Sequence, residues 1–338
     1  MVSERPATRS RTTLIWLAVA VAVIAIGGFL AFQLSPWPSA LVIRRYFDAG
    51  GLATARALEK HVPPGIAQHV NLRYDASDAD ALLDVFHPAD IDASERLTTI
   101  VWVHGGGWVA GGKDQIANWV RIIAGHGYTT VGVDYSTAPG ARYPKPVRQA
   151  NTALSWLVSN SARLHIDPSH LFLAGDSAGA HVVAQLANLV SVASYAQALG
   201  IQPSIRREQL RGVILFCGAY DLRKPALDGS FGYFAANMLW SYSGTREFRN
   251  DPAFATASVA AYVDKAFPPT FISAGNADPL APQSVAFAQT LAQNDVVVDT
   301  LFYPRDHTPP LGHEYQFDLD TDEAKRVLER MLAFVAAH

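Results

Sequence analysis

The sequence has little cysteine and little imbalance of charge. Its single cysteine, Cys217, excludes an internal disulfide, a cysteine-rich zinc site and an iron–sulfur cluster built by this chain alone. The 27 basic and 30 acidic residues give a formal net charge of −3, so the chain lacks the positive excess by which proteins bind nucleic acid. Glycine (24) and proline (20) are near ordinary usage, which excludes collagen-like and low-complexity chains. With 338 residues, 49% of them hydrophobic, the chain is long enough to bury a large core.

The N-terminal region contains one long stretch without charge, residues 14–34. At about 1.5 Å per helical residue this stretch reaches roughly 30 Å, the thickness of the hydrocarbon core of a bilayer. It predicts a retained transmembrane signal-anchor helix that would attach the protein to a membrane. Two alternatives stay open: a buried core helix, and a cleaved signal peptide that would leave a secreted protein.

The charges that flank this stretch bear on its orientation. Arg5, Arg9 and Arg11 precede it and Arg44 and Arg45 follow it, so the positive-inside bias is small. We expect residues 1–13 to form a basic cytoplasmic tail and the body of the protein to lie outside the cytoplasm.

Beyond the apolar stretch, residues 35–68 read as a linker with short helical pieces, and residues 69–338 alternate strands with helices. This alternation predicts one α/β domain with a mostly parallel central sheet and helices on both faces. Two alternating segments near its start resemble half-exposed antiparallel strands, and shorter apolar segments resemble buried parallel strands. The antiparallel strands are expected at 70–74 and 82–86, the others at 98–104, 129–134, 170–174, 213–217, 270–273 and 296–303, and the helices at 115–125, 147–161, 178–198, 282–293 and 321–337.

One segment interrupts this alternation of strands and helices. Residues 221–267 contain no clear strand but many aromatic residues. So long an excursion inside a compact domain predicts a helical lid or a pocket wall. The alternative is ordinary packing of a helical excursion onto the core.

A serine motif follows the strand expected at 170–174. Gly175-Asp176-Ser177-Ala178-Gly179 has the form G-x-S-x-G and stands between this strand and a helix. Glycines without side chains allow a tight turn, which lifts the serine hydroxyl to the carboxyl edge of the sheet. The free N–H groups of the following helix N-terminus point at any anion that develops there. The placement predicts a nucleophile rather than an ordinary turn serine.

A second glycine-rich motif, His104-Gly105-Gly106-Gly107-Trp108, follows the strand expected at 98–104. Three successive glycines let backbone N–H groups converge on one oxygen, as an oxyanion hole requires, whereas the alternative is merely a flexible loop. We expect Gly106 and Gly107, together with Ala178, to be the oxyanion donors, and His104 to shape the loop.

A serine nucleophile needs a base, and the base needs an orienting carboxylate. Position favours His313, after the last strand, over its loop neighbour His307. It favours Asp278, after the preceding strand, over Asp221; Asp306, in the loop of the histidines, is a weaker alternative.

The motifs HGGGW, GDSAGA, GNADPL and GHEY, in this order, resemble the α/β-hydrolase superfamily. They are most similar to its esterase/lipase branch, which includes hormone-sensitive lipase and bacterial carboxylesterases. The resemblance covers roughly residues 69–338 and implies Ser177 as nucleophile, Asp278 as acid and His313 as base. Ala180, where glycine is common, and the N-terminal apolar stretch depart from the branch pattern.

The resemblance implies a carboxylesterase-type serine hydrolase that cleaves short to medium acyl or aryl esters through an acyl-enzyme. It implies no metal and no organic cofactor, and its partner is a small-molecule ester. Amidase, formamidase or peptidase activity on the same machinery is the alternative, and an idle membrane-anchored binding module is a further one.

Overall fold

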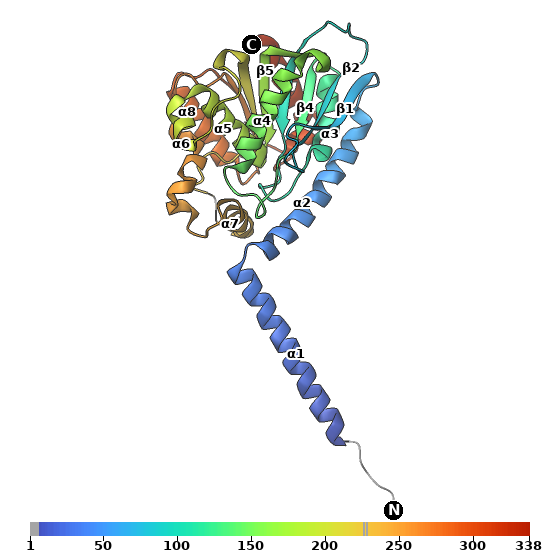
Figure 1. Cartoon of the computed structure of the whole chain (residues 1–338), viewed down its shortest axis with the longest axis vertical. Helices are drawn as coiled ribbons and strands as arrows, with labels where there is room; N and C mark the ends of the chain where they lie inside the picture. Colours follow the sequence, from blue (N-terminus) through green and yellow to red (C-terminus); the bar gives the residue numbers. More distant parts are fainter. Residues whose placement is uncertain (1–6, 226, 228) are drawn as a thin grey trace, which may run out of the picture.

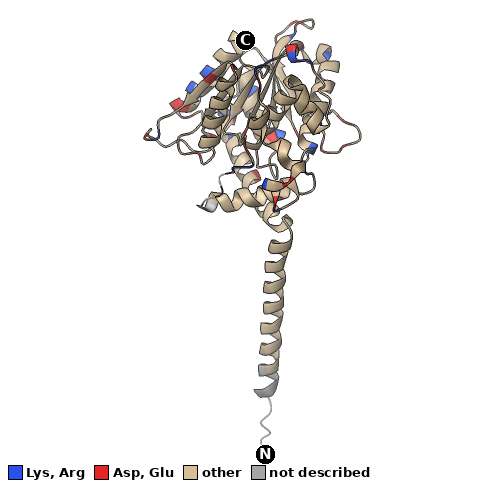
Figure 2. Cartoon of the chain, turned by 90° about the vertical axis from the view of Figure 1, so that its left-hand side faces the viewer, with Lys and Arg blue, Asp and Glu red and all other residues tan. Residues whose placement is uncertain are grey.

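The computed structural model describes residues 7–225, 227 and 229–338, so Arg5 of the expected basic tail lies outside the described residues. Helix α1, Ala7–Leu34, projects from a body of strands and helices (Figure 1). Its segment Thr12–Leu34 has a mean hydropathy of 2.6 and none of it is buried. Figure 2 shows no charged residue along this segment. A buried core helix is therefore wrong, whereas a membrane span and a signal sequence both fit.

The body is built on a single sheet in the order β1-β2-β4-β3-β5-β6-β7-β8. Strand β2 runs antiparallel to both of its neighbours, and all other neighbouring pairs are parallel. The predicted mostly parallel sheet with antiparallel strands at its start is confirmed. The strands are β1 Ile66–Arg73, β2 Leu82–Pro88, β3 Leu97–Val103, β4 Thr129–Val133, β5 Ile166–Asp176, β6 Leu210–Phe216, β7 Thr270–Ala274 and β8 Val298–Phe302.

Helices cover both faces of this sheet. Five of them connect or follow the parallel strands: α3 Lys113–Ala124, α4 Lys145–Ser159, α5 Ser177–Ser191, α8 Ala281–Gln293 and α9 Asp322–Ala337. The remaining elements are α2 Trp37–Leu58, α6 Ala193–Leu199, α7 Gly229–Ser243 and the 3-10 helices η1 Glu59–His61, η2 Ser161–Leu164, η3 Arg207–Gln209, η4 Phe248–Asn250, η5 Pro252–Ala257, η6 Val259–Tyr262 and η7 Tyr315–Phe317.

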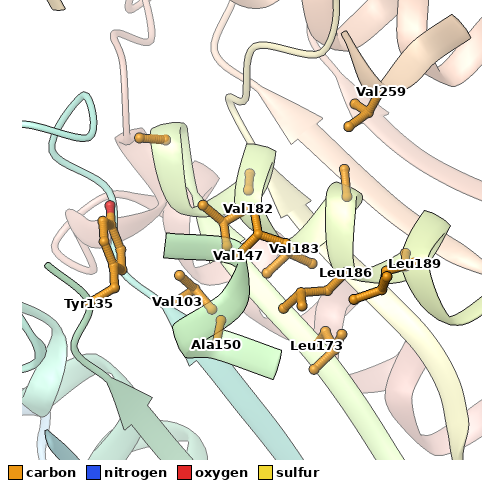
Figure 3. Close-up of a cluster of buried hydrophobic side chains, with 14 of the residues drawn as sticks. Val103, Tyr135, Val147, Ala150, Leu173, Val182, Val183, Leu186, Leu189 and Val259 are labelled. Carbon is orange, nitrogen blue, oxygen red and sulfur yellow. The ribbon is translucent and has the colours of Figure 1, made fainter. Parts of the chain in front are cut away.

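The core consists of two layers because side chains alternate along each strand. Val103 of β3 faces the helices α4, α5 and α8, whereas Trp102 faces α3 and α9. Figure 3 shows the first layer, in which Leu173 lies beneath Leu186 of α5 and Val103 lies beside Val147 and Ala150. Burial on both faces explains why these strands are apolar throughout and why the sequence predicts them as parallel.

The structure adds detail to two segments, residues 35–68 and 221–267, for which the sequence predicts only a linker and a lid. The region 35–68 holds one continuous helix, α2, rather than short helical pieces, and β1 begins within it. The expected lid segment 221–267 holds α7 and three 3-10 helices. Tyr242 and Phe254 of this segment are buried, whereas Tyr233 and Phe234 are exposed.

Candidate active site

Ser177 lies at the turn between β5 and α5, at the carboxyl edge of the sheet. Its φ of +50° lies in the left-handed region that residues with a Cβ rarely adopt. A Cβ on Gly175 would collide with the backbone of Gly179. A Cβ on Gly179 would collide with the carbonyl oxygens of Val103 and His104. The two glycines therefore allow the close approach of β5, α5 and β3 on which this turn depends.

A chain of hydrogen bonds joins three side chains from separate loops. Ser177 Oγ lies 3.0 Å from His313 Nε2, and His313 Nδ1 lies 2.9 Å from Asp278 Oδ2. Asp278 is buried, and its other oxygen accepts the backbone N–H of Leu280 at 2.7 Å. With the ring proton on Nδ1 toward Asp278, Nε2 is free to accept the proton of the Ser177 hydroxyl.

The alternative residues are directed elsewhere. His307 Nε2 lies 3.1 Å from Glu323 Oε1, and Asp221 Oδ1 accepts the backbone N–H of Arg223 at 3.2 Å. Asp306 is exposed. The structure thus brings together Ser177, Asp278 and His313 and leaves the alternatives outside this hydrogen-bonded chain.

The protonation of His313 is governed by its neighbours. Burial disfavours the charged ring, but a hydrogen bond to the Cys217 sulfur and the hydrogen-bonded Asp278 carboxylate favour it, so the pKa of His313 lies well above its ordinary value of 6.5. Burial also raises the pKa of the Cys217 thiol to about 11, so the thiol is protonated at neutral pH. Ligand atoms of Cys217, Asp278 and His313 lie within 4.8 Å of one another. Because Asp278 and His313 already bond to each other and the thiol keeps its proton, this group is poorly suited to hold a metal ion.

The loop of three glycines lies beside the serine turn. Gly106 and Gly107 have φ values of +109° and +60°, which only glycine adopts without strain. A Cβ on Gly107 would collide with Met238 of α7, so the loop packs tightly under that helix. His104 is buried, stacks on the Tyr135 ring with centroids 4.3 Å apart and bonds through Nδ1 to the Gly105 carbonyl oxygen at 2.7 Å. It shapes the loop, as expected.

A cavity of about 590 Å³ connects these parts. Its lining includes Ser177, His313, Gly106, Gly107 and Ala178, and the remaining lining is largely apolar. Its walls come from α2 on one side and from α7 and the segment before it on the other. The space has the size and character of a site for a small apolar ligand.

The sequence matches a family model described as the alpha/beta hydrolase fold over residues 100–307. The match includes the glycine loop, the serine turn and Asp278, and it spans more than half of the chain. The chain belongs to the alpha/beta hydrolase fold family.

Similar proteins of this family are named as esterases. The hydrolase is 28% identical to carboxylesterase NlhH of Mycobacterium tuberculosis over 298 residues, which are 85% of this chain and 88% of that protein. It is 27% identical to esterase LipQ of the same organism over 79% of this chain but only 60% of LipQ. The crystal structure of esterase B from Lactobacillus rhamnosis shares the fold, with a TM-score of 0.77 at 24% identity over 89% of this chain and 95% of that one. The predicted α/β-hydrolase fold is confirmed, and the relatives support carboxylic ester hydrolysis.

The hydrolase also holds an acidic pair that sequence reasoning missed. Asp176 is buried, accepts the indole N–H of Trp102 at 2.7 Å and is hydrogen-bonded to the Glu314 carboxyl group. Burial, and the charge of Glu314, raise the pKa of Asp176 to about 8. A Cβ on Gly105 would collide with the Asp176 carboxylate, so the pair lies against the glycine loop. Each acid is the neighbour of a predicted site residue, Ser177 or His313, and only the fold brings the two together.

The hydrolase takes one wall of the cavity from α2, which the sequence places in the expected linker. Arg44 Nε donates to the carbonyl oxygen of Val109 at 2.6 Å, and Asp48 Oδ1 accepts the N–H of Gly111 at 3.0 Å. The Val109 carbonyl group and the Gly111 N–H both belong to the loop between β3 and α3, which begins with the three glycines. The helix next to the apolar N-terminal segment therefore fixes the loop beside Ser177.

Proposed function

We propose that the protein is a serine esterase in which Ser177 is the nucleophile, His313 the general base and Asp278 the orienting acid. The observation that carries this proposal is the hydrogen-bonded chain from Asp278 through His313 to Ser177, with distances of 2.9 and 3.0 Å. The N–H groups of Gly106, Gly107 and Ala178 are proposed as the oxyanion donors, because these residues line the same cavity as Ser177.

In this mechanism His313 accepts the Ser177 proton while the hydroxyl oxygen attacks the ester carbonyl carbon. The three N–H groups stabilise the oxyanion of the tetrahedral intermediate. The intermediate collapses as His313 gives its proton to the leaving alcohol, which leaves an acyl group on Ser177. A water molecule then repeats the sequence on the acyl-enzyme and releases the acid.

The substrate proposed from the cavity is an ester with an apolar acyl or aryl group of short to medium length. An apolar lining in a cavity of about 590 Å³ supports this class. The segment 221–267, which supplies one wall, is proposed as the lid. Amides are the competing substrate class, because the same nucleophile attacks them.

We further propose that residues 14–34 anchor the catalytic domain, residues 69–338, to a membrane, with residues 1–13 in the cytoplasm and the domain outside it. The exposed apolar surface of Thr12–Leu34 supports an anchor. N-terminal sequencing of the protein isolated from membranes tests it: an anchor predicts an uncut chain in the membrane fraction. A chain that begins after residue 34 and lies in the soluble fraction would instead establish a cleaved signal peptide.

Labelling with a fluorophosphonate probe tests the proposed chemistry. The wild-type chain should be labelled once, at Ser177, and should hydrolyse p-nitrophenyl butyrate. Ser177→Ala should lose both properties, with activity reduced by about 10⁶-fold, as for a lost serine nucleophile. Ser191→Ala is the matched control on the same helix and should keep both. A panel of acyl and aryl esters with the corresponding amides then separates esterase from amidase; an unlabelled wild-type chain would indicate an idle binding module.

A further inference from the structure

The apolar side chains exposed on the body are concentrated around one opening. Outside α1, seven of the ten large apolar side chains exposed in the described part of the chain lie on α2 and α7. They are Trp37, Leu41, Val42, Tyr46 and Leu52 on α2 and Tyr233 and Phe234 on α7. We call these seven side chains the apolar rim. Helices α2 and α7 contact each other, and exposed apolar side chains gathered on neighbouring helices mark a binding surface rather than ordinary solvent-exposed protein.

The exposed face of α2 has the composition of a helix that lies in a membrane interface. Its exposed charges are basic, Arg45 and Arg56, whereas its acid Asp48 is half-buried and bonded to Gly111. Aromatic, aliphatic and basic side chains on one exposed face favour the boundary between lipid headgroups and acyl chains. A typical water-exposed helix face would carry acidic side chains as well.

The apolar rim is continuous with the proposed membrane anchor. Helix α2 begins three residues after the end of α1 and turns away from its line at this break (Figure 1). Arg246, just beyond α7, donates to the carbonyl oxygen of Gln33 at 2.8 Å and stacks over the Trp240 ring at 3.8 Å. The carbonyl group at the end of α1 is thus held by the α7 segment. Helices α2 and α7, which carry the rim, therefore both lie next to the end of α1, the point at which this helix would leave a bilayer.

The cavity opens within this rim. Tyr46, which is 76% exposed, lines the cavity and belongs to the rim, and the exposed Ala49 and Gly50 of α2 line it as well. Phe231 of α7 lines it on the other side. An ester that leaves the lipid at α2 would reach Ser177 along apolar side chains without crossing water.

We propose that the apolar rim rests on the lipid bilayer and that the enzyme takes ester lipids directly from the membrane. The proposal rests on the esterase activity and membrane anchor proposed above. The scissile acyl group enters the cavity while the remaining tails stay in the bilayer, so the substrate class is a membrane-dissolved lipid ester. The bilayer, rather than a second copy of the chain, covers the rim because the rim continues from α1 and the exposed charges of α2 are basic.

Lipid quenching of a fluorophore tests the contact without requiring activity. Val42 on the rim and Val297 at the amino end of β8 are exposed to the same degree, 60% and 61%, which makes them a matched pair. Val42→Cys and Val297→Cys, in the full-length chain, are labelled with nitrobenzoxadiazole and reconstituted into phosphatidylcholine–phosphatidylglycerol vesicles. Doxyl-labelled lipids should quench position 42 by at least half and leave position 297 unquenched. An unquenched label at position 42, including one shielded by a second copy of the chain, overturns the proposal.

Substrate partitioning tests the route. Val42→Glu and Tyr233→Glu should reduce hydrolysis of a vesicle-dissolved diacylglycerol that carries one short acyl chain by at least 10-fold. Hydrolysis of soluble p-nitrophenyl butyrate should stay within twofold of wild type. Val297→Glu should change neither rate. A wild-type chain that hydrolyses only the soluble ester, or rim variants with wild-type rates on vesicles, overturn the route. A wild-type chain that hydrolyses no ester contradicts the esterase proposal instead, and the quenching result then still decides where the rim lies.

Discussion

At the residue scale, the site depends on contacts that tolerate no alternative side chain. The carbonyl oxygens of Val103 and His104 occupy the space that a Cβ on Gly179 would need. The glycines of the serine motif predict a tight turn at this position. The structure shows why glycine is needed there, because β3 and α5 approach each other closely. Position in the sequence also favours His313 over His307, but the physical reason appears only in the structure, where tertiary contacts direct His307 to Glu323.

Asp278→Asn tests the orienting role of this acid. Loss of the carboxylate should lower kcat by about 10⁴-fold, the loss known for the corresponding change in serine protease triads. In the wild type, activity needs neutral His313, so kcat/KM should rise with pH through a midpoint above 6.5, because the pKa of His313 is raised. Residual activity of the variant should show that midpoint at lower pH, since the imidazolium has lost a favourable neighbour.

The control for this change is Asp221→Asn, which alters the alternative acid. It should leave both the rate and the midpoint near those of wild type. A large loss of activity in Asp221→Asn, with little loss in Asp278→Asn, would show that Asp221 rather than Asp278 is the orienting acid.

Asp176 should make stability depend on pH. With its pKa raised to about 8, the folded protein keeps a proton on Asp176 that the unfolded chain releases near pH 4. This group therefore makes stability fall as pH rises from about 4 to about 8, and it adds no further change above that range. Asp176→Asn is neutral at every pH, so the decrease in Tm between pH 5 and pH 8 should be smaller in the variant. Circular dichroism of the full-length chain in detergent measures this, and the exposed Asp90→Asn should retain the wild-type slope.

At the scale of elements, α2 is the part of the molecule that the sequence described least well. Four prolines and a glycine pair in the region 35–68 favour a broken linker, yet Trp37–Leu58 is one helix. Tertiary contacts explain the difference, because Arg44 and Asp48 bond to the loop of the three glycines. Packing against the domain thus overrides weak local preference, as it does for most helices.

Asp48→Ala should disturb the site through this element. Without the acceptor for the Gly111 N–H, the loop loses a fixed point, and kcat should fall several-fold while KM for p-nitrophenyl butyrate changes little. The rate of fluorophosphonate labelling should fall in parallel, which loss of folded protein alone would not cause. Arg56→Ala, at an exposed position on the same helix, is the control. Equal rates in Asp48→Ala and wild type would show that α2 does not position the loop.

At the scale of the whole molecule, two apolar layers on a twisted sheet hold three loops at one edge. Those loops come from β5, β7 and β8, and each supplies one member of the chain Ser177, Asp278 and His313. Parallel strands end at the same edge, so the geometry of the site follows from the stability of the layers.

Leu186→Ala should weaken the whole molecule rather than the site alone. Leu186 of α5 is 1% exposed and packs in the layer shown in Figure 3, so its truncation should cost about 2–5 kcal/mol of unfolding free energy. Urea unfolding of the full-length chain in detergent measures the loss. Val297→Ala, on the surface, should stay within about 0.5 kcal/mol of wild type. A comparable loss at Val297 would contradict this assignment of the core.

The alternation of strands and helices, the two glycine motifs and the apolar N-terminal stretch can all be recognised in the amino-acid sequence. Each is a local pattern, set by the period of a strand, by the space in a turn or by the length of an uncharged run. The tertiary structure adds three facts: the hydrogen bonds that join His313 to Ser177 and Asp278, the buried contact between Asp176 and Glu314, and the cavity wall formed by α2. These facts depend on which distant segments pack together, and burial and hydrogen bonding across such segments leave no local signature in the chain.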